Sequence, residues 1–214
     1  MGPSGSGKST TLLHIVGVYR ARRGGVDVMG VDVGRQGVEE LRSLRRKVGF
    51  LFQGAALIGW LSVYDNVALP LRETMQIPKD EIRERVHKAL QLVRLWPDHN
   101  KYPSELSGGM RKRAGLARAI ITNPEIILYD EPTAGLDPAM SAQIEQLIRN
   151  LRETVGVTSV LVTHDVQCAS TCGSRIGILS EGRLQAEGGP DLLRSEEPAV
   201  LRFLGKAVAA GEAT

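Results

Sequence analysis

The chain has 214 residues, of which 42% are hydrophobic and 24% are charged, and this composition is ordinary for a globular protein with a buried core. It excludes intrinsic disorder, a collagen-like repeat and a small disulfide scaffold. The 27 Lys and Arg only slightly outnumber the 24 Asp and Glu, so the net charge of +3 is too small to indicate a nucleic-acid partner.

The sequence carries no pattern typical of a membrane segment or an oxidising compartment. No stretch approaches about 18 uninterrupted apolar residues, and we expect no secretory signal, because no basic segment is followed by an apolar one. Cys168 and Cys172 have a spacing that matches no zinc pattern, so we interpret them as packing residues in a reducing cytosol. Any role at a membrane is therefore expected to come through a partner.

Residues 1–10 form a glycine-rich segment, MGPSGSGKST, that satisfies the pattern G-x-x-x-x-G-K-[ST]. Glycines let backbone N–H groups turn inward around a phosphate. In this pattern Lys8 reaches the β- and γ-phosphates of a nucleotide, and the Ser9 hydroxyl ligates Mg²⁺. Residues 11–16 suit the helix that directs its positive end at the same phosphates. A flexible Gly/Ser terminus is the alternative interpretation.

Three short apolar runs that end in polar side chains are predicted to be β-strands: residues 47–53, 124–131 and 158–163. An apolar run without alternation suits a parallel strand that is buried on both faces. Open α/β sheets bind ligands at the carboxyl ends of their strands. We therefore expect one edge of the sheet to carry the polar residues that close these runs, Gln53, Asp130, Glu131 and His164. Residues 175–179 add a further strand, and Glu181-Gly182 predicts a hairpin turn.

The polar residues expected at this edge suit phosphate and metal chemistry. Asp130 is expected to hold Mg²⁺, directly or through water, and Glu131 to polarise an attacking water. His164 follows its strand directly and is a candidate contact to a γ-phosphate. A solvated strand end and a structural histidine are the alternatives for these positions.

Two helices are predicted between the first and second of these strands. Over residues 80–95 an apolar stripe recurs at helical spacing, with Asp80 placed to cap the helix. Ser107 is predicted to cap a second helix that runs to about Ile121. Its first turns hold two glycines and the cations at 111–113, which weaken a helix and oppose its dipole. We interpret this end as reserved for an anion, with a structural cap and a basic surface as the alternative.

The order of these motifs along the chain resembles that of the nucleotide-binding subunit of ABC transporters. The resemblance covers nearly the whole sequence and rests on GPSGSGKST, Gln53, LSGGM, IILYDEP, AGLDP and VTHD. It implies an α/β P-loop ATPase with a mainly parallel sheet flanked by helices, a helical subdomain, and first strands that are missing from the sequence. Within one domain, 1–214, it implies a RecA-like core at 1–53 and 123–190, a helical subdomain at about 54–122 and a C-terminal helical tail at about 190–214.

The resemblance also implies ATP and Mg²⁺ as cofactors and assigns a role to each motif residue. The nucleotide would be bound by Gly5, Ser6, Gly7, Lys8, Ser9, Thr10 and Gln53. The metal would be held by Ser9, Gln53 and Asp130, with Glu131 as the general base and His164 as the γ-phosphate switch. Two copies would form a head-to-tail homodimer with two shared ATP sites. In that dimer Ser107, Gly108 and Gly109 would contact the ATP held by the other copy, and Asp137 would lie in the dimer contact.

Three shorter features resemble the ATPases of the maintenance-of-lipid-asymmetry and mammalian-cell-entry lipid transporters. They are Met110, where most family members carry Gln, and the segments 64–73 and 197–204. This resemblance implies that ATP hydrolysis powers the transport of phospholipid or another lipid through a separate membrane permease. It places the chain on the cytoplasmic face of the inner membrane, with lipid-carrier and accessory subunits as further partners and no nucleic acid.

We predict that residues 55–78 form the groove on which the permease docks. The segment follows Gln53 and contains an apolar cluster in a loop-like region, where exposed apolar surface usually marks an interface. The alternative is that Trp60 and Leu61 simply fill the helical subdomain.

Two other classes of function are weighed against a transport ATPase. A soluble ABC-type ATPase acting on DNA or ribosomes is disfavoured by the short segment between Gln53 and Ser107, which has no sustained heptads. A truncated, non-catalytic ATP-binding module is disfavoured by the intact Lys8, Asp130, Glu131 and His164, whereas the missing upstream strands favour it. Family members carry strands and an adenine-stacking aromatic residue before the loop. We therefore expect the natural chain to begin upstream of Met1, and expect the chain as given to bind ATP weakly, with Gly2 to Gly5 frayed.

Overall fold

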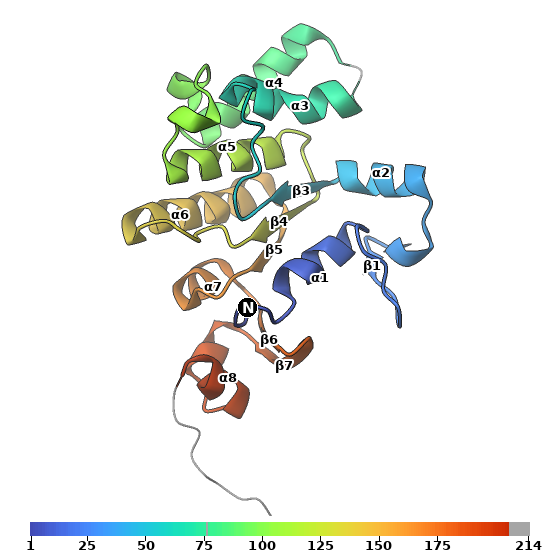
Figure 1. Cartoon of the computed structure of the whole chain (residues 1–214), viewed down its shortest axis with the longest axis vertical. Helices are drawn as coiled ribbons and strands as arrows, with labels where there is room; N and C mark the ends of the chain where they lie inside the picture. The colour runs from blue at the N-terminus through green and yellow to red at the C-terminus, as the bar shows by residue number, and fades with distance from the viewer. Residues whose placement is uncertain (76, 206–214) are drawn as a thin grey trace, which may run out of the picture.

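The computed structural model describes residues 1–75 and 77–205, and Figure 1 shows them in layers around a small parallel sheet. The sheet consists of β3 (Val48–Leu51), β4 (Ile126–Asp130) and β5 (Thr158–Val162), in that order. Helices α5 (Gly108–Ile120), α6 (Pro138–Val155) and α7 (Val166–Cys172) lie on one side of it, and α1 (Lys8–Ile15) and α2 (Val38–Arg46) lie on the other. The three predicted strands and the α/β class are thereby confirmed.

The strands β3, β4 and β5 run parallel, so their carboxyl ends meet at one edge. Leu51 pairs with Tyr129, and Tyr129 pairs with Leu161. Leu51, Leu128 and Tyr129 are fully buried, as expected of strands that helices cover on both faces. Burial also raises the pKa of Tyr129 to about 12. The polar residues that follow the three strands are brought to the same edge of the sheet.

An antiparallel hairpin of β6 (Ile176–Ser180) and β7 (Arg183–Gly188) lies beyond β5, with α8 (Pro198–Phe203) packed against it. Between its strands, Glu181 (φ 51°) and Gly182 (φ 72°) both adopt left-handed backbone conformations. This is the conformation that tight two-residue hairpin turns require. The predicted hairpin is confirmed.

The first residues of the chain are held between the end of β5 and β6. The Leu179 N–H donates to the Met1 carbonyl at 2.7 Å, and the Gly2 N–H donates to the Thr163 carbonyl at 3.3 Å. A Cβ on Gly2 would lie 2.0 Å from the carbonyl oxygen of Leu179, so glycine is required there. The expected fraying is therefore wrong for Gly2, which is buried and bonded to a neighbouring segment.

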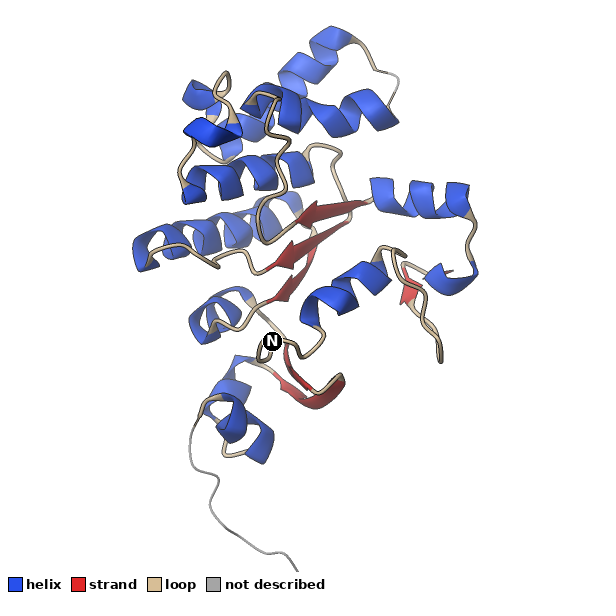
Figure 2. Ribbon diagram, viewed as in Figure 1, coloured by secondary structure: helices blue, strands red, loops and turns tan. Residues whose placement is uncertain are grey.

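Helices α3 (Val63–Thr74), α4 (Lys79–Leu92) and α5 pack together next to β3, in a part of the molecule that Figure 2 shows as helical. The apolar stripe predicted for residues 80–95 is buried in this core: Ile82, Val86, Ala89, Leu90 and Val93. The predicted cap of α4 is wrong. The helix begins at Lys79 after Pro78, and Asp80 lies in its first turn, where a negative charge still faces the positive end of the helix dipole.

A short ribbon of β1 (Asp27–Val28) and β2 (Val31–Asp32) connects α1 to α2. Within the two described ranges, no helix combines the length and the hydrophobicity that crossing a bilayer would take.

Candidate nucleotide-binding site

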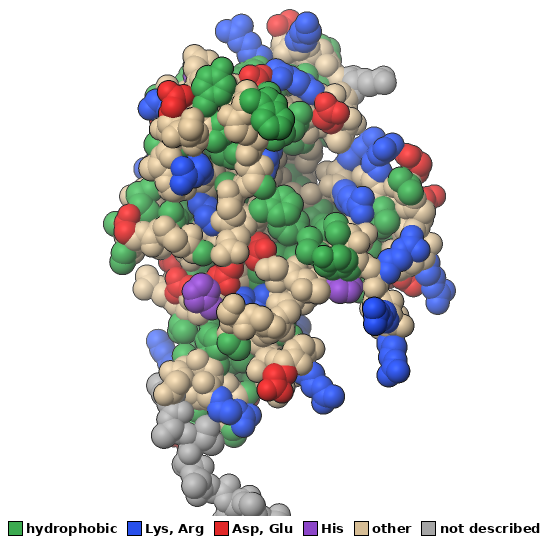
Figure 3. Space-filling view, in the orientation of Figure 1, with side chains coloured by type: hydrophobic (Ala, Val, Ile, Leu, Met, Phe, Trp, Pro, Cys, Tyr) green, Lys and Arg blue, Asp and Glu red, His purple; other side chains and the backbone are tan. Residues whose placement is uncertain are grey.

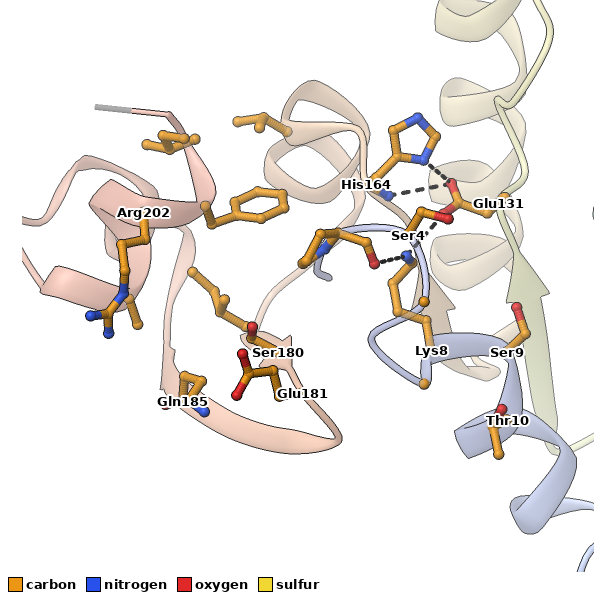
Figure 4. Close-up of a pocket in the computed structure, with 18 of the residues that line it drawn as sticks. Ser4, Lys8, Ser9, Thr10, Glu131, His164, Ser180, Glu181, Gln185 and Arg202 are labelled. Carbon is orange, nitrogen blue, oxygen red and sulfur yellow. Dashed lines mark hydrogen bonds and ion pairs between the residues drawn. The ribbon is translucent and has the colours of Figure 1, made fainter. Parts of the chain in front are cut away.

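A cavity of about 1120 Å³ opens at the carboxyl edge of the parallel sheet. The glycine-rich loop lines one end, and the other end is lined by the β6–β7 hairpin and α8, where Figure 4 shows Gln185 and Arg202. The predicted site residues that line this cavity are Gly5, Gly7, Lys8, Ser9, Thr10, Gln53, Glu131 and His164. Segments that are far apart in the sequence are thus brought to one concave surface.

The glycine-rich loop turns at two glycines. Gly5 (φ 77°) and Gly7 (φ 101°) adopt left-handed backbone conformations that residues with a Cβ rarely take. Gly7 is also the N-cap of α1, so no side chain caps the first N–H groups of this helix. Ser6 is buried beside them. A helix N-terminus without a side-chain cap, at the end of a glycine-rich loop, is suited to bind an anion.

Lys8 lies buried at the centre of the site. Its ammonium donates to the carbonyls of Gly2 and Pro3, each at 2.9 Å, and lies 3.5 Å from Oε1 of Glu131 (Figure 4). The side chains of Lys8 and Glu131 are each 8% exposed, so little solvent screens the charges of this pair. The ammonium is therefore held between the loop and the carboxylate.

Ser9 connects α1 to the end of β4. Its hydroxyl donates to Oδ1 of Asp130 at 2.8 Å. A hydroxyl beside a carboxylate suits Mg²⁺, which usually completes its octahedron with substrate phosphates and water. Within residues 1–75 and 77–205, no cluster of three or more His, Cys, Asp or Glu side chains could hold a metal ion. The hydroxyl of Ser9 and the carboxylate of Asp130 fit a Mg²⁺ that would share its coordination with a nucleotide.

Glu131 combines an unusual backbone with a carboxylate that is bonded on both oxygens. Its φ of 46° is left-handed, which costs on the order of 1–2 kcal/mol for a residue with a Cβ. Oε2 accepts from the Thr163 hydroxyl at 3.2 Å and from the His164 backbone N–H at 3.3 Å, and it lies 2.9 Å from Nδ1 of the His164 ring. Oε1 faces Lys8. These contacts fix the carboxylate at the wall of the cavity.

His164 and Thr163 approach Glu131 from the end of β5. The His164 side chain is 63% exposed and lines the cavity, whereas Thr163 is fully buried. Sequence reasoning identified His164 but missed Thr163, although its hydroxyl is the last polar group before His164. A polar residue that closes an apolar run is a signal that could have found it.

The residues predicted to act on the other copy's ATP do not line this cavity. Ser107 caps α5 as predicted, with its hydroxyl accepting from the Met110 N–H at 3.2 Å. Gly109 lies against Met140, because an added Cβ would be 2.2 Å from the end of that side chain. Asp137 caps α6 by accepting from the Met140 N–H at 2.9 Å. Ser107, Gly108, Gly109 and Asp137 therefore gather around the starts of α5 and α6, apart from the cavity.

Of the three cations at 111–113, Lys112 is buried within the fold instead of lying exposed at the start of α5. Its residue exposure is only 5%, and its ammonium donates to the backbone carbonyls of Gln53 at 2.5 Å and Glu131 at 2.8 Å. Burial lowers the pKa of Lys112 to about 8. The signal missed in the sequence is helical spacing: Lys112 shares a buried stripe with Gly109, Leu116 and Ala119.

A second cavity, of about 570 Å³, lies between α2, β3 and α3, and we call it the docking groove. Its apolar lining includes Phe50, Phe52, Ala56, Ile58 and Pro70. Four arginines also line it, Arg42, Arg45, Arg46 and Arg118, and Figure 3 shows hydrophobic and basic side chains around the hollow.

The docking groove includes part of the segment 55–78 that was predicted for this role. Trp60 does not line this groove and is 82% exposed, so it neither forms part of the groove as predicted nor fills the helical subdomain. Leu61 also lies outside the groove lining and is half-buried.

Comparison with known proteins defines the class of the chain. The profile described as "ABC transporter" matches residues 1–134, which is more than half of the sequence. The chain therefore belongs to the ABC transporter family. The structure also resembles the dimeric ATP-binding cassette MJ0796 in a post-hydrolysis state bound to ADP and Pi, with a TM-score of 0.82 and 39% identity over 89% of this chain and 83% of that chain.

The chain is also similar to the curated ATP-binding proteins of two transport systems. Over 205 residues, the chain is 45% identical to the "probable ribonucleotide transport ATP-binding protein mkl" of Mycobacterium leprae, covering 95% of this chain and 59% of that protein. Over 205 residues it is 40% identical to the intermembrane phospholipid transport system ATP-binding protein MlaF of Haemophilus influenzae, covering 95% of this chain and 78% of MlaF. The chain thus spans less than two thirds of the length of mkl.

Proposed function

We propose that this chain binds ATP with Mg²⁺ and hydrolyses it as the ATP-binding subunit of an ABC transporter. The observation that carries the proposal is that the glycine-rich loop with Lys8, the Ser9 hydroxyl bonded to Asp130, and Glu131 with His164 come together at the edge of one cavity. These supply a phosphate cradle, a metal-binding pair and a positioned base.

In this proposal the residues at the cavity divide phosphate binding, metal binding and proton transfer among them. Residues Gly5 to Thr10 bind the phosphates, and Ser9, Gln53 and Asp130 hold Mg²⁺. When bound, the metal offsets phosphate charge and polarises the bond to be cleaved. Glu131 takes the proton of the attacking water through its carboxylate, which Thr163 and the His164 backbone hold in place. The exposed ring of His164 contacts the γ-phosphate.

The test is phosphate release from ATP by the purified chain, compared between the wild type and Glu131→Gln, with ATP binding measured separately by titration. Release by the wild type that the variant lacks supports the proposal. Binding without release by either protein would indicate the alternative of a non-catalytic ATP-binding module.

A second copy of the chain is proposed as the first partner. Ser107, Gly108 and Gly109 lie outside the cavity, so one chain leaves their side of a nucleotide open. In a two-fold dimer they contact the ATP bound by the partner, with Asp137 in the dimer contact. The dimeric cassette MJ0796, at 39% identity, supports this arrangement.

A membrane permease is proposed as the second partner, seated in the docking groove. The groove combines aromatic side chains, including the stacked pair Phe50 and Phe52, with four arginines. This surface fits a short segment that presents apolar and acidic side chains. Docking there places the chain on the cytoplasmic face of the inner membrane.

For the transported molecule we propose phospholipid or another lipid. Met110 and the segments 64–73 and 197–204 support this class, as does the similarity to MlaF over most of its length. The similarity to mkl, a protein named for ribonucleotide transport, makes a nucleotide the second candidate. Mass spectrometry of small molecules that co-purify with the membrane complex from the native host would decide between them. That purification would also show whether lipid-carrier and accessory subunits are present, or whether DNA or ribosomes are bound instead.

A further inference from the structure

We propose that Lys112 is a positioning residue that joins the Gln loop, residues 52–56, to the backbone of Glu131. The inference rests on the proposed hydrolysis at Glu131 and assigns a specific part of the site's geometry to a buried lysine of α5.

The contacts of Lys112 bridge two segments that are distant in sequence. Its ammonium donates to the carbonyl of Gln53, 59 residues away, and to the carbonyl of Glu131, 19 residues away. A buried amine that loses its hydrogen-bond partners is destabilising, and so are the buried carbonyls that it leaves behind. The bridge therefore fixes the distance between the metal-binding loop and the base.

A second cation of α5 holds the other end of the Gln loop. Arg118 donates to the carbonyls of Ala55 and Ala56, each at 2.7 Å. Both alanines have left-handed backbones, with φ values of 61° and 46°, which are unfavourable for a residue with a Cβ. The loop conformation is therefore imposed by contacts with α5, and Lys112 and Arg118 supply them.

Glu131 also has a left-handed backbone, with a φ of 46°. Its N–H donates to the Val162 carbonyl at 2.9 Å, and its own carbonyl accepts from Lys112. Removing the ammonium leaves this carbonyl with the longer bond from the Ala134 N–H, at 3.2 Å, so the strained residue is held less firmly. The carboxylate would then move relative to Gln53, which would change hydrolysis more than nucleotide binding.

The same helix reaches the docking groove, because Arg118 and Ala119 line it together with Phe52 and Ala56. A partner seated there contacts the loop that Lys112 and Arg118 hold. A displacement of the loop reaches the Glu131 carbonyl through one side chain, that of Lys112.

The first experiment compares Lys112→Met with Lys88→Met, a matched change at an exposed helical lysine that pairs with Glu84. We expect Lys112→Met to lower kcat about 10-fold or more while ATP affinity stays within about twofold, and Lys88→Met to change neither. Equal losses of kcat and of affinity would show a general structural role and overturn the proposal.

Hydrogen exchange gives a readout without turnover: in Lys112→Met, amides near 53–56 and near 131–134 should both exchange faster, while those of α5 stay protected.

The second experiment is a double-mutant cycle between Lys112→Met and Gln53→Ala. If Lys112 acts by holding the Gln loop, the loss of kcat in the double variant should be smaller than the product of the single losses. Independent, multiplicative losses would overturn the proposal. A wild-type chain that binds ATP without hydrolysing it would defeat the proposed function instead, and the hydrogen exchange comparison would still decide the role of Lys112.

Discussion

The imidazole Nδ1 of His164 lies 2.9 Å from Oε2 of Glu131, although the two residues follow different strands of the sheet. The ring shares that oxygen with the Thr163 hydroxyl and the His164 backbone N–H. The other oxygen of Glu131 faces Lys8. Several groups hold the carboxylate in place. A substitution that keeps the shape of the side chain but removes its basicity therefore tests the role of Glu131 as a base separately from its position.

Glu131→Gln is expected to stop turnover while ATP binding remains. The amide keeps the size and polarity of the side chain but cannot take a proton, and general-base contributions are typically about 100-fold or more. Phosphate release and ATP titration measure the two effects. Glu84→Gln, at an exposed ion pair with Lys88, serves as the control. Wild-type release by Glu131→Gln would show that another group is the base.

Ser107→Arg is expected to lower hydrolysis about 100-fold or more with little loss of ATP affinity in the monomer. Ser107 caps α5 outside the cavity of its own chain, so its proposed contact with ATP lies across a dimer. Ser104→Arg, three positions earlier on the exposed surface, should leave hydrolysis unchanged. An equal loss of monomer affinity in Ser107→Arg would argue for a role within one chain.

Gly2→Ala is expected to lower both stability and ATP affinity. The added Cβ would meet the backbone carbonyl of Leu179, which cannot rotate away, so the loop must shift at a cost of about 1–3 kcal/mol. Thermal unfolding and ATP titration measure the result. Gly59→Ala is the matched control, because nothing lies within 4 Å of a Cβ there. Equal melting temperatures for both variants would contradict the role of Gly2.

Glu145→Gln is expected to stabilise the fold more at pH 8 than at pH 5. Glu145 is only 3% exposed, and burial, followed by the charge of Asp165, raises its pKa. A raised carboxyl pKa means that the folded state holds a proton that the unfolded state releases, so the wild type loses stability as pH rises from the ordinary carboxyl pKa of 4.5 through the folded pKa.

Urea unfolding of wild type and Glu145→Gln at the two pH values measures this difference, which we expect to be larger at pH 8 than at pH 5. The comparison between the two proteins cancels the titration of other groups. A difference that is independent of pH would contradict the prediction.

Ile58→Asp is expected to reduce association with the membrane about 10-fold. The aspartate would bury a charge in an apolar part of the docking groove when the permease is seated. The measurement is the fraction of the chain that sediments with membranes of the native host. Leu184→Asp, at a 57% exposed position on β7, is the control. Unchanged sedimentation of Ile58→Asp would place the permease elsewhere.

Much of the fold could be predicted from the sequence because the strands are continuous apolar runs with polar ends. That pattern located β3, β4 and β5 and predicted that Gln53, Glu131 and His164 share one edge of the sheet. In the structure these three residues line one cavity. The start of α4 was mispredicted because Asp80 resembles a cap, whereas Pro78 occupies that position. Local sequence does not specify the start of a helix to within two residues.

Contacts with backbone groups that are distant in the sequence could not be predicted. Lys112 stands in a row of cations, and only its place on the buried stripe of α5 distinguishes it from Arg111. Its partners are the carbonyls of Gln53 and Glu131. Because every residue carries a backbone carbonyl, the sequence does not indicate which ones Lys112 contacts. The fixing of Gly2 by Thr163 has the same origin.

The separation of Ser107 from the cavity of its own chain has a genetic consequence for the proposed dimer. Each ATP site would be encoded half by one copy and half by the other. Two inactive alleles, Lys8→Ala and Ser107→Arg, would then complement each other, because the mixed dimer pairs the intact loop of one chain with the intact α5 start of the other. A single allele that carries both changes would inactivate both sites of a mixed dimer with wild type, because each site would contain one altered half. Such an allele would behave as a dominant mutation.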